Sequence, residues 1–229
     1  MKVYLDSADV ASWALPRGCP PVCGITTNPT LLLRAGLPVT LGSAQYLLQA
    51  AADHGMAELM LQLPSNDAVQ ARQWIVPLQD SAAARNVRLT IKLPCHPDWL
   101  PCVAVLQGLR QPFLLTGLSN AVQLLWAQSL QADFVAPYLG RLAADGRDVW
   151  TLVQACVAVQ SGGPALLAAS IRSSDVLARL LACGAAAVTV PPASLVGWAD
   201  DALTQAAMAQ FAQDAAASLA LKPAGSQPK

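Results

Sequence analysis

The sequence of 229 residues carries little charge. Its formal net charge is zero, and charged residues make up only 12% of it, whereas hydrophobic residues make up 54%. A chain without net charge has no overall field to attract nucleic acid or an anionic membrane surface. We therefore expect neither as a partner, and an anionic small molecule would have to be held by a few local cations. The large apolar share predicts an extensive buried core.

Long uninterrupted apolar runs are also missing. Two stretches, 111–132 and 149–171, contain no charged residue, but Gln, Ser, Asn or Gly-Gly-Pro interrupt them. Neither is typical of a membrane-spanning helix, which needs about 20 predominantly apolar residues. The first ten residues, MKVYLDSADV, have an acidic residue where a secretory signal needs an apolar run. These absences predict a cytoplasmic protein with no membrane partner.

Motifs for metals and nucleotides are absent as well. The six cysteines show no C-x2-C spacing, and without a secretory signal we expect reduced thiols, most of them buried. Cys95 and His96 form the only adjacent pair of soft ligands, and no other ligand stands at a spacing that suits zinc. Neither G-x-G-x-x-G nor G-x-x-x-x-G-K-S/T occurs. The sequence predicts no metal and no cofactor.

Lysine is scarce, and its distribution is uneven. Lys2, Lys222 and Lys229 lie near the two ends, and Lys92 stands alone in the interior. Lys92 belongs to VRLTIKLP (87–94), whose Val, Thr and Ile favour a packed strand that ends at its proline. An ammonium at the end of a buried strand loses hydration, which lowers its pKa and yields a nucleophilic amine. This indicates a Schiff-base lysine; the alternative is a lysine that reaches from a strand end to solvent.

Short extended segments alternate with helical stretches along the chain. The segments are apolar almost throughout, as expected of parallel strands that helices cover. Eight such units in a chain of this length predict a (β/α)8 barrel, with a doubly wound sheet as the alternative. The eight strands are expected at 3–6, 22–27, 58–63, 87–94, 112–116, 134–138, 165–170 and 187–190.

A last helix is expected at 202–221. Apolar residues recur there at every fourth position, which makes one apolar stripe that packs on the barrel or on a neighbouring subunit. The stripe consists of Leu203, Ala207, Phe211, Ala215 and Leu219. We predict a single domain over residues 1–221, this helix included, and a disordered tail at 222–229.

Polar residues gather at the ends of the expected strands. In a (β/α)8 barrel those carboxyl ends share one face, which holds the active site. One lysine among hydroxyls, amides and a carboxylate, without a cofactor motif, indicates carbonyl chemistry through a Schiff base, and two arginines with a serine could clamp a phosphate. The residues concerned are Asp6, Thr27, Asn28, Gln62, Lys92, Thr116, Tyr138, Arg141, Ser170 and Arg172.

Each of these residues also has a plainer interpretation. Asp6 could cap the following helix, and Asn28 before Pro29 is an ordinary turn signal. Arg141 could pair with Asp145. The others, Gln62, Thr116 and Tyr138, could be polar residues satisfied at the barrel end.

Six segments taken in order resemble the transaldolase family. They are LDSAD, TTNPT, IKLP, APYLGR, AASIRS and TVPP, and they cover nearly the whole chain. The resemblance is strongest to the short members that include fructose-6-phosphate aldolase. It implies the (β/α)8 barrel with the Schiff-base lysine on the fourth strand, and a homo-oligomer, ring-like, with the last helix as a candidate contact.

The resemblance also assigns roles to individual residues. The Schiff-base lysine falls on Lys92, the strand-one aspartate on Asp6, and the threonine that helps hold the catalytic water on Thr116. The substrate-binding residues of the TTNP motif fall on Thr27 and Asn28. The serine and arginines that bind phosphate fall on Ser170, Arg172 and Arg141.

Two positions bear on the reaction. Transaldolases commonly carry a glutamate on strand three and a phenylalanine in the motif that here reads APYLGR, whereas this chain has Gln62 and Tyr138. That pairing resembles the aldolase. We therefore predict cleavage of fructose 6-phosphate to glyceraldehyde 3-phosphate and dihydroxyacetone. The alternatives are a true transaldolase of the pentose phosphate pathway, a Schiff-base enzyme on another keto substrate, and a non-catalytic barrel that binds sugar phosphates.

Overall fold

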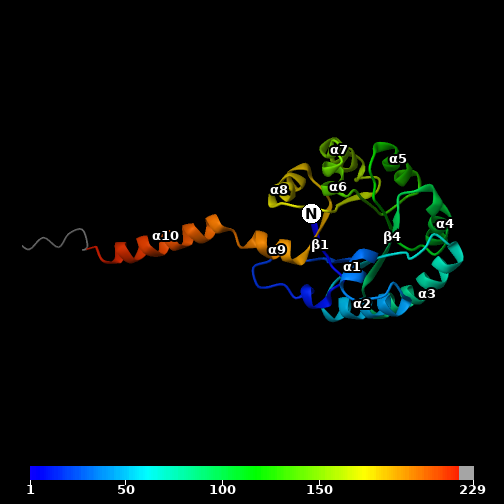
Figure 1. The fold of residues 1–229 in the computed structure, drawn as a ribbon, viewed down its shortest axis with the longest axis horizontal. Coiled ribbons are helices and arrows are strands. Elements are labelled where there is room, and N and C mark those ends of the chain that lie inside the picture. The colour runs from blue at the N-terminus through cyan, green and yellow to red at the C-terminus, as the bar shows by residue number, and fades with distance from the viewer. Residues whose placement is uncertain (222–229) are drawn as a thin grey trace, which may run out of the picture.

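Eight parallel strands form a closed barrel in the computed structural model, which describes residues 1–221 (Figure 1). Each strand pairs with the next in sequence, and β8 pairs with β1, so the sheet has no free edge. The predicted (β/α)8 fold is confirmed, and closure excludes the doubly wound alternative. The strands are β1 Lys2–Asp6, β2 Gly24–Thr26, β3 Glu58–Gln62, β4 Arg88–Pro94, β5 Phe113–Thr116, β6 Phe134–Ala136, β7 Ala165–Ala168 and β8 Ala187–Val190.

Helices follow the strands and surround the barrel (Figure 1). Side-chain caps define several of their first residues: Asp67 caps α3, Asp148 caps α7 and Ser173 caps α8. The helices are η1 Val10–Trp13, α1 Pro29–Arg34, α2 Leu41–Asp53, α3 Ala68–Arg85, η2 Pro97–Trp99, α4 Leu100–Gly108, α5 Ala121–Ser129, α6 Leu139–Ala144, α7 Val149–Val159, α8 Ser174–Cys183, α9 Pro192–Ala199 and α10 Ala202–Leu219.

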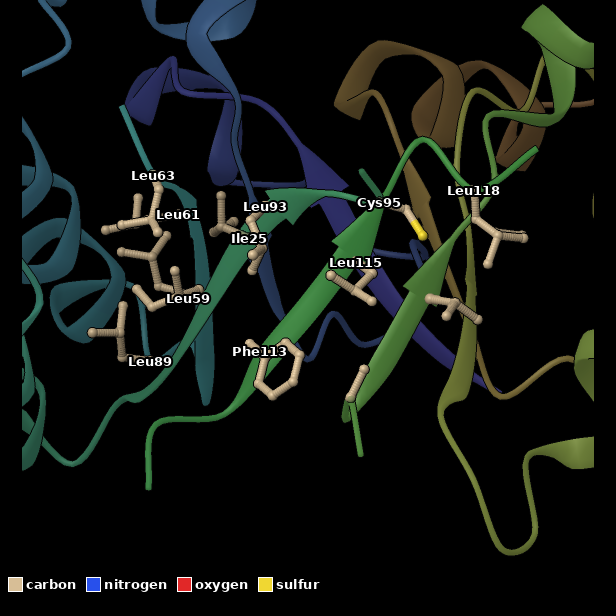
Figure 2. Close-up of a cluster of buried hydrophobic side chains, with 14 of the residues drawn as sticks. Ile25, Leu59, Leu61, Leu63, Leu89, Leu93, Cys95, Phe113, Leu115 and Leu118 are labelled. Atoms are coloured by element: carbon tan, nitrogen blue, oxygen red, sulfur yellow. The ribbon is translucent and has the colours of Figure 1, made fainter. Parts of the chain in front are cut away.

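The strands are apolar over most of their length because both of their faces are buried. Leu59, Leu61 and Leu115 point outward into the layer between strands and helices, part of which Figure 2 shows. Their neighbours Met60 and Leu114 belong to a separate cluster inside the barrel. Successive residues of a strand point to opposite faces, so this alternation divides one apolar run between two cores.

The strand register brings distant residues to one end of the barrel. Gln62 on β3 lies beside Lys92 on β4. Asp6 on β1 lies beside Thr26 on β2. Because all eight strands are parallel, these residues meet at the carboxyl ends, as the sequence predicts.

The last helix, α10, extends away from the barrel (Figure 1). None of its side chains is buried, and Phe211 of the apolar stripe is 70% exposed. Of the two packing alternatives, packing on the barrel is therefore wrong. The single domain over 1–221 stays a prediction, and the tail expected at 222–229 lies outside the described residues. Within the described part of the chain, no helix combines the length and the apolar character needed to cross a membrane.

None of the six cysteines, all of which the structure describes, is in a disulfide. Cys95, Cys102 and Cys156 are buried, and the other three are partly exposed. Half of the six cysteines are buried, whereas the sequence analysis expected most of them to be.

Candidate active site

A cavity of about 530 Å³ opens at the carboxyl ends of the strands. Its volume lies within the range of about 300–1,000 Å³ that is usual for small-molecule sites. Nine of the ten residues predicted from the sequence line it: Asp6, Asn28, Gln62, Lys92, Thr116, Tyr138, Arg141, Ser170 and Arg172. The tenth, Thr27, lines a much smaller neighbouring cavity and faces the site through its backbone carbonyl.

Lys92 is buried at the end of β4. Of the two charged residues of β4, Arg88 and Lys92, only Lys92 lines the cavity, and it is 4% exposed. The Nζ atom donates a hydrogen bond to the carbonyl oxygen of Thr27 at 2.7 Å. Burial lowers the pKa of Lys92 to about 8, and nearby Asp6 opposes part of that shift. The alternative, a lysine that reaches solvent, is wrong.

Asp6 is held by two threonines. The hydroxyl of Thr26 donates to Asp6 Oδ1 at 2.9 Å, and the Oγ1 atoms of Thr26 and Thr189 lie 2.6 Å apart. Both threonines are buried. Asp6 does not cap the following helix, because Asp9 takes that place in η1, so the capping interpretation is wrong. The chain of hydroxyls instead fixes the carboxylate beside the cavity.

Tyr138 lies between a hydroxyl and a cation. Thr116 Oγ1 donates to the phenol oxygen at 2.5 Å, which leaves the phenol's own proton for a group in the cavity. The guanidinium of Arg141 lies over the Tyr138 ring, 4.7 Å from its centroid. Asp145 pairs with Arg147 at 2.8 Å, so the alternative in which Arg141 pairs with Asp145 is wrong.

The turn after β7 is tightly packed against α6. Ser170 has φ 60°, a left-handed conformation that is uncommon for a residue other than glycine. Its carbonyl accepts the Gly140 N–H at 3.0 Å. A Cβ on Gly140 would lie 2.6 Å from both the Ser170 carbonyl oxygen and Arg172 Nε. Only glycine at 140 therefore permits this arrangement of Ser170 and Arg172.

Asn28 has a structural role besides its place in the cavity lining. Its Oδ1 accepts the Leu31 N–H at 3.0 Å and caps α1, with Pro29 in the first turn. The dipeptide thus begins a helix rather than a simple turn. The amide nitrogen of Asn28 has no protein partner among the described residues, so it remains a donor for a ligand.

Four residues that matter here escaped the sequence analysis. Thr26 and Thr189 position the carboxylate, Gly140 permits the turn at Ser170, and Arg34 at the end of α1 adds a third arginine to the cavity lining. Thr26, Thr189 and Gly140 lie within the quoted motifs TTNPT, TVPP and APYLGR, which was the available signal. Arg34 carried none, because its relevance depends on its place at the cavity in the folded barrel.

The arrangement suits carbonyl chemistry without a metal ligand set. Over residues 1–221, no three His, Cys, Asp or Glu side chains gather in a way that could hold a metal ion. A buried amine, a carboxylate and a phenol face one cavity, and arginines line its mouth. An amine near its pKa can add to a carbonyl, and the carboxylate and phenol can carry protons.

Sequence comparison finds relatives that match nearly the whole chain. No protein-family model matches the chain. It is 29% identical over 217 residues to a probable transaldolase of Cereibacter sphaeroides, covering 93% of this chain and 95% of that protein. It is 28% identical to a probable transaldolase of Rhizobium meliloti, covering 93% and 96%.

Solved structures show the fold. The 3-hexulose-6-phosphate synthase of Salmonella typhimurium superposes with a TM-score of 0.58 at 13% identity, covering 87% of this chain and 95% of that one. Thiamine phosphate pyrophosphorylase from Pyrococcus furiosus superposes with a TM-score of 0.52 at 15% identity, covering 85% and 87%. At such identities the likeness concerns the barrel alone. The sequence likeness to curated relatives named as probable transaldolases extends over nearly the full length of both partners and supports membership of the transaldolase family.

Proposed function

We propose that this protein is a cytoplasmic Schiff-base aldolase of the transaldolase family that cleaves fructose 6-phosphate between C3 and C4. The observation that carries the proposal is Lys92: a buried amine with a pKa near 8, inside a cavity that a carboxylate and three arginines also line. At pH 7 about a tenth of such an amine is neutral, whereas an ordinary lysine is almost wholly protonated.

The first steps form and cleave the adduct. The Lys92 amine adds to the C2 ketone, and loss of water gives an iminium. Asp6 takes the proton of the C4 hydroxyl, the C3–C4 bond breaks, and its electron pair flows toward the iminium. Glyceraldehyde 3-phosphate leaves, and a three-carbon enamine stays on Lys92. The position of Asp6 beside the cavity, held by Thr26, supports its role as the base.

Binding of the phosphate is assigned to Arg141, Arg172 and Ser170. All three line the cavity. Neither the Arg141 nor the Arg172 guanidinium is in an ion pair with an acidic residue of the described chain. Hydrogen bonds from a guanidinium to a phosphate are charge-assisted and specific in geometry. Asn28 and Thr27 are assigned to the substrate's hydroxyl groups near Lys92.

The fate of the enamine separates the aldolase from its main alternative. Protonation at C3 and hydrolysis release dihydroxyacetone, whereas attack on an aldose phosphate makes the enzyme a true transaldolase. We favour the aldolase because Tyr138, Thr116 and Gln62 can together hold a water beside Lys92. The 2.5 Å contact between Thr116 and the Tyr138 phenol supports such a water site.

One experiment tests the whole proposal. Protein is incubated with fructose 6-phosphate, treated with sodium borohydride and digested, and the modified peptide is identified by mass. The proposal expects a reduced three-carbon adduct on Lys92. An adduct of another mass would indicate a different keto substrate. No adduct and no glyceraldehyde 3-phosphate would leave the non-catalytic sugar-phosphate barrel.

A second experiment separates aldolase from transaldolase. Phenylalanine at 138 cannot donate a proton, and loss of a general acid typically costs 10² to 10⁴-fold. Tyr138→Phe should therefore lose dihydroxyacetone release yet keep transfer to erythrose 4-phosphate, and Gln62→Glu should move the balance the same way. The measurement is the ratio of dihydroxyacetone to sedoheptulose 7-phosphate. Tyr46→Phe, on the exposed surface of α2, is the matched control; the same ratio in all proteins would refute the assigned role of Tyr138.

We also propose that copies of the chain assemble into a ring-like homo-oligomer through α10. The exposed apolar stripe of this helix, with Phe211 at its centre, supports the proposal. Light scattering coupled to size exclusion should give a multimer for the wild type and a smaller species for Phe211→Asp. A monomeric wild type would contradict the assembly without affecting the proposed chemistry.

A further inference from the structure

We infer that the cavity holds a second anion subsite, centred on Arg34, and that the site accepts a ketose phosphate with another anionic group at its C1 end. The inference rests on the proposed function, since it takes Lys92 as the point where C2 is bound. It adds to that function a class of substrate, the ketose bisphosphates.

The barrel topology separates Arg34 from the other two arginines. Arg34 ends α1, which follows β2, whereas Arg141 lies in α6, which follows β6. In a closed ring of eight strands, β2 and β6 lie on opposite sides. Lys92 on β4 lies halfway between them along the ring. All three residues line the same cavity, so cations flank the amine from two opposite sides.

Arg34 is available to a ligand. Within residues 1–221 its guanidinium makes neither a hydrogen bond nor an ion pair with another side chain, and the residue is exposed at the cavity mouth. The only acidic residue in the cavity lining is Asp6, which is engaged with Thr26. No carboxylate of the lining is therefore left to neutralise Arg34.

One phosphate does not account for all three arginines of the cavity lining. A phosphate monoester carries a charge of about −1.5 to −2 at pH 7, which Arg141 and Arg172 together balance. Arg34 then remains as a separate cation across the cavity. A cation at the wall of a cleft attracts a ligand that carries a negative group next to it, here next to Arg34.

The direction of the bound sugar identifies the end that meets Arg34. With the C6 phosphate on Arg141 and Arg172 and with C2 on Lys92, C1 continues toward the β2 side of the cavity. Asn28 and Arg34 lie on that side, at the two ends of α1. A phosphate on C1 can therefore pair with Arg34. Cleavage proceeds through the same steps as before, and the three-carbon product keeps the C1 phosphate.

The test compares two ketoses that release the same aldehyde. Values of kcat/KM are measured for fructose 6-phosphate and fructose 1,6-bisphosphate by the appearance of glyceraldehyde 3-phosphate. The proteins are wild type, Arg34→Gln, Arg34→Lys and the control Arg72→Gln, which removes an exposed arginine of α3 that does not line the cavity. Loss of one hydrogen bond to a charged group changes an affinity or a kcat/KM by about tenfold or more.

The expected result is selective. Arg34→Gln should lower kcat/KM for fructose 1,6-bisphosphate about tenfold and for fructose 6-phosphate less than twofold, and Arg34→Lys should restore part of the loss. The Arg72→Gln control should change neither. Equal effects on both ketoses, or no effect on the bisphosphate, would overturn the subsite while leaving the proposed function intact.

Failure of the proposed function gives a different result. In that case neither ketose releases glyceraldehyde 3-phosphate, and binding of the two ketoses is measured by calorimetry instead. A preference for the bisphosphate that disappears in Arg34→Gln would still support the subsite. Equal affinities for both ketoses in wild type and variant would refute it.

Discussion

The barrel interior holds one buried charged side chain at each end, and the two differ in how many partners they have. Glu58, 5% exposed, begins β3 at the amino end. It accepts hydrogen bonds from the Tyr4 phenol at 2.7 Å and from the Thr90 hydroxyl at 2.5 Å, and Arg88 lies 3.5 Å away. Lys92 at the carboxyl end is as deeply buried, yet it has one hydrogen bond, to a backbone carbonyl.

The pKa shifts at the two ends of the barrel reflect this difference in pairing. At the amino end, burial and the charge of Glu58 raise the pKa of Tyr4, so the phenol stays a donor to the carboxylate. At the carboxyl end, burial lowers the pKa of Lys92 to about 8. A well-paired buried charge holds the barrel together, whereas a poorly paired one remains reactive. This matches the usual division of (β/α)8 barrels into a stabilising face and a catalytic face.

The strongest test of this division is Lys92→Met. We expect no turnover and no borohydride adduct, because Lys92 is the only lysine between Lys2 and Lys222. The free energy of unfolding should stay the same or rise, because the change removes a buried charge that has one partner. Activity and urea unfolding are measured together, with Lys2→Met as the control. Trapping by a folded Lys92→Met protein would remove Lys92 from the mechanism.

The opposite change is Glu58→Ala at the amino end. The change leaves the buried Tyr4 and Thr90 hydroxyls without their acceptor, and a buried donor left unsatisfied costs about 1–3 kcal/mol, so the free energy of unfolding should fall by at least that order. The kcat of the protein that stays folded should remain close to wild type. Asp145→Ala breaks the exposed pair with Arg147 and should cost less than about 1 kcal/mol. A Glu58→Ala protein with full stability but lost activity would reverse the roles of the two ends.

Gly140→Ala tests the packing behind the phosphate site. Its Cβ would overlap the Ser170 carbonyl and Arg172 Nε, so both must shift. Loss of a hydrogen bond to a charged group is worth about 1.5–3 kcal/mol, and kcat/KM for fructose 6-phosphate should fall about ten- to a hundredfold. Gly162→Ala, where a Cβ meets no atom within 4 Å, is the control. Equal kinetics for the two variants would show that the close approach at Gly140 has no part in binding.

The pH dependence should follow Lys92. The neutral amine is the nucleophile, so the rate of adduct trapping should rise about tenfold per pH unit below pH 8 and level off above it. Stability changes in the same direction. Between pH 8 and 10.5 the unfolded chain binds the proton that the native Lys92 has lost, so stability rises with pH in wild type relative to Lys92→Met. A rate that keeps rising to pH 10 would mean that the amine has an ordinary pKa.

Much of the fold could be predicted from local patterns. The expected strand at 187–190 has the observed bounds, and each end of the other strands lies within two residues of its expected position. The short helices α1, α4, α6 and α9 were not individually predicted. The first of them begins where Asn28-Pro29 indicated only a turn, because a cap and a turn use the same residues.

The sequence by itself determined the alternation of strands and helices, the isolated lysine and the set of polar residues at the strand ends. These depend on the order of residues and on the period of each element, which are local properties. Tertiary structure alone decided that Arg141 lies over Tyr138 rather than pairing with Asp145, and that Thr189 joins Thr26 and Asp6. Thr26 and Thr189 are 163 residues apart in the chain, and only closure of the barrel between β8 and β1 brings them within hydrogen-bonding distance.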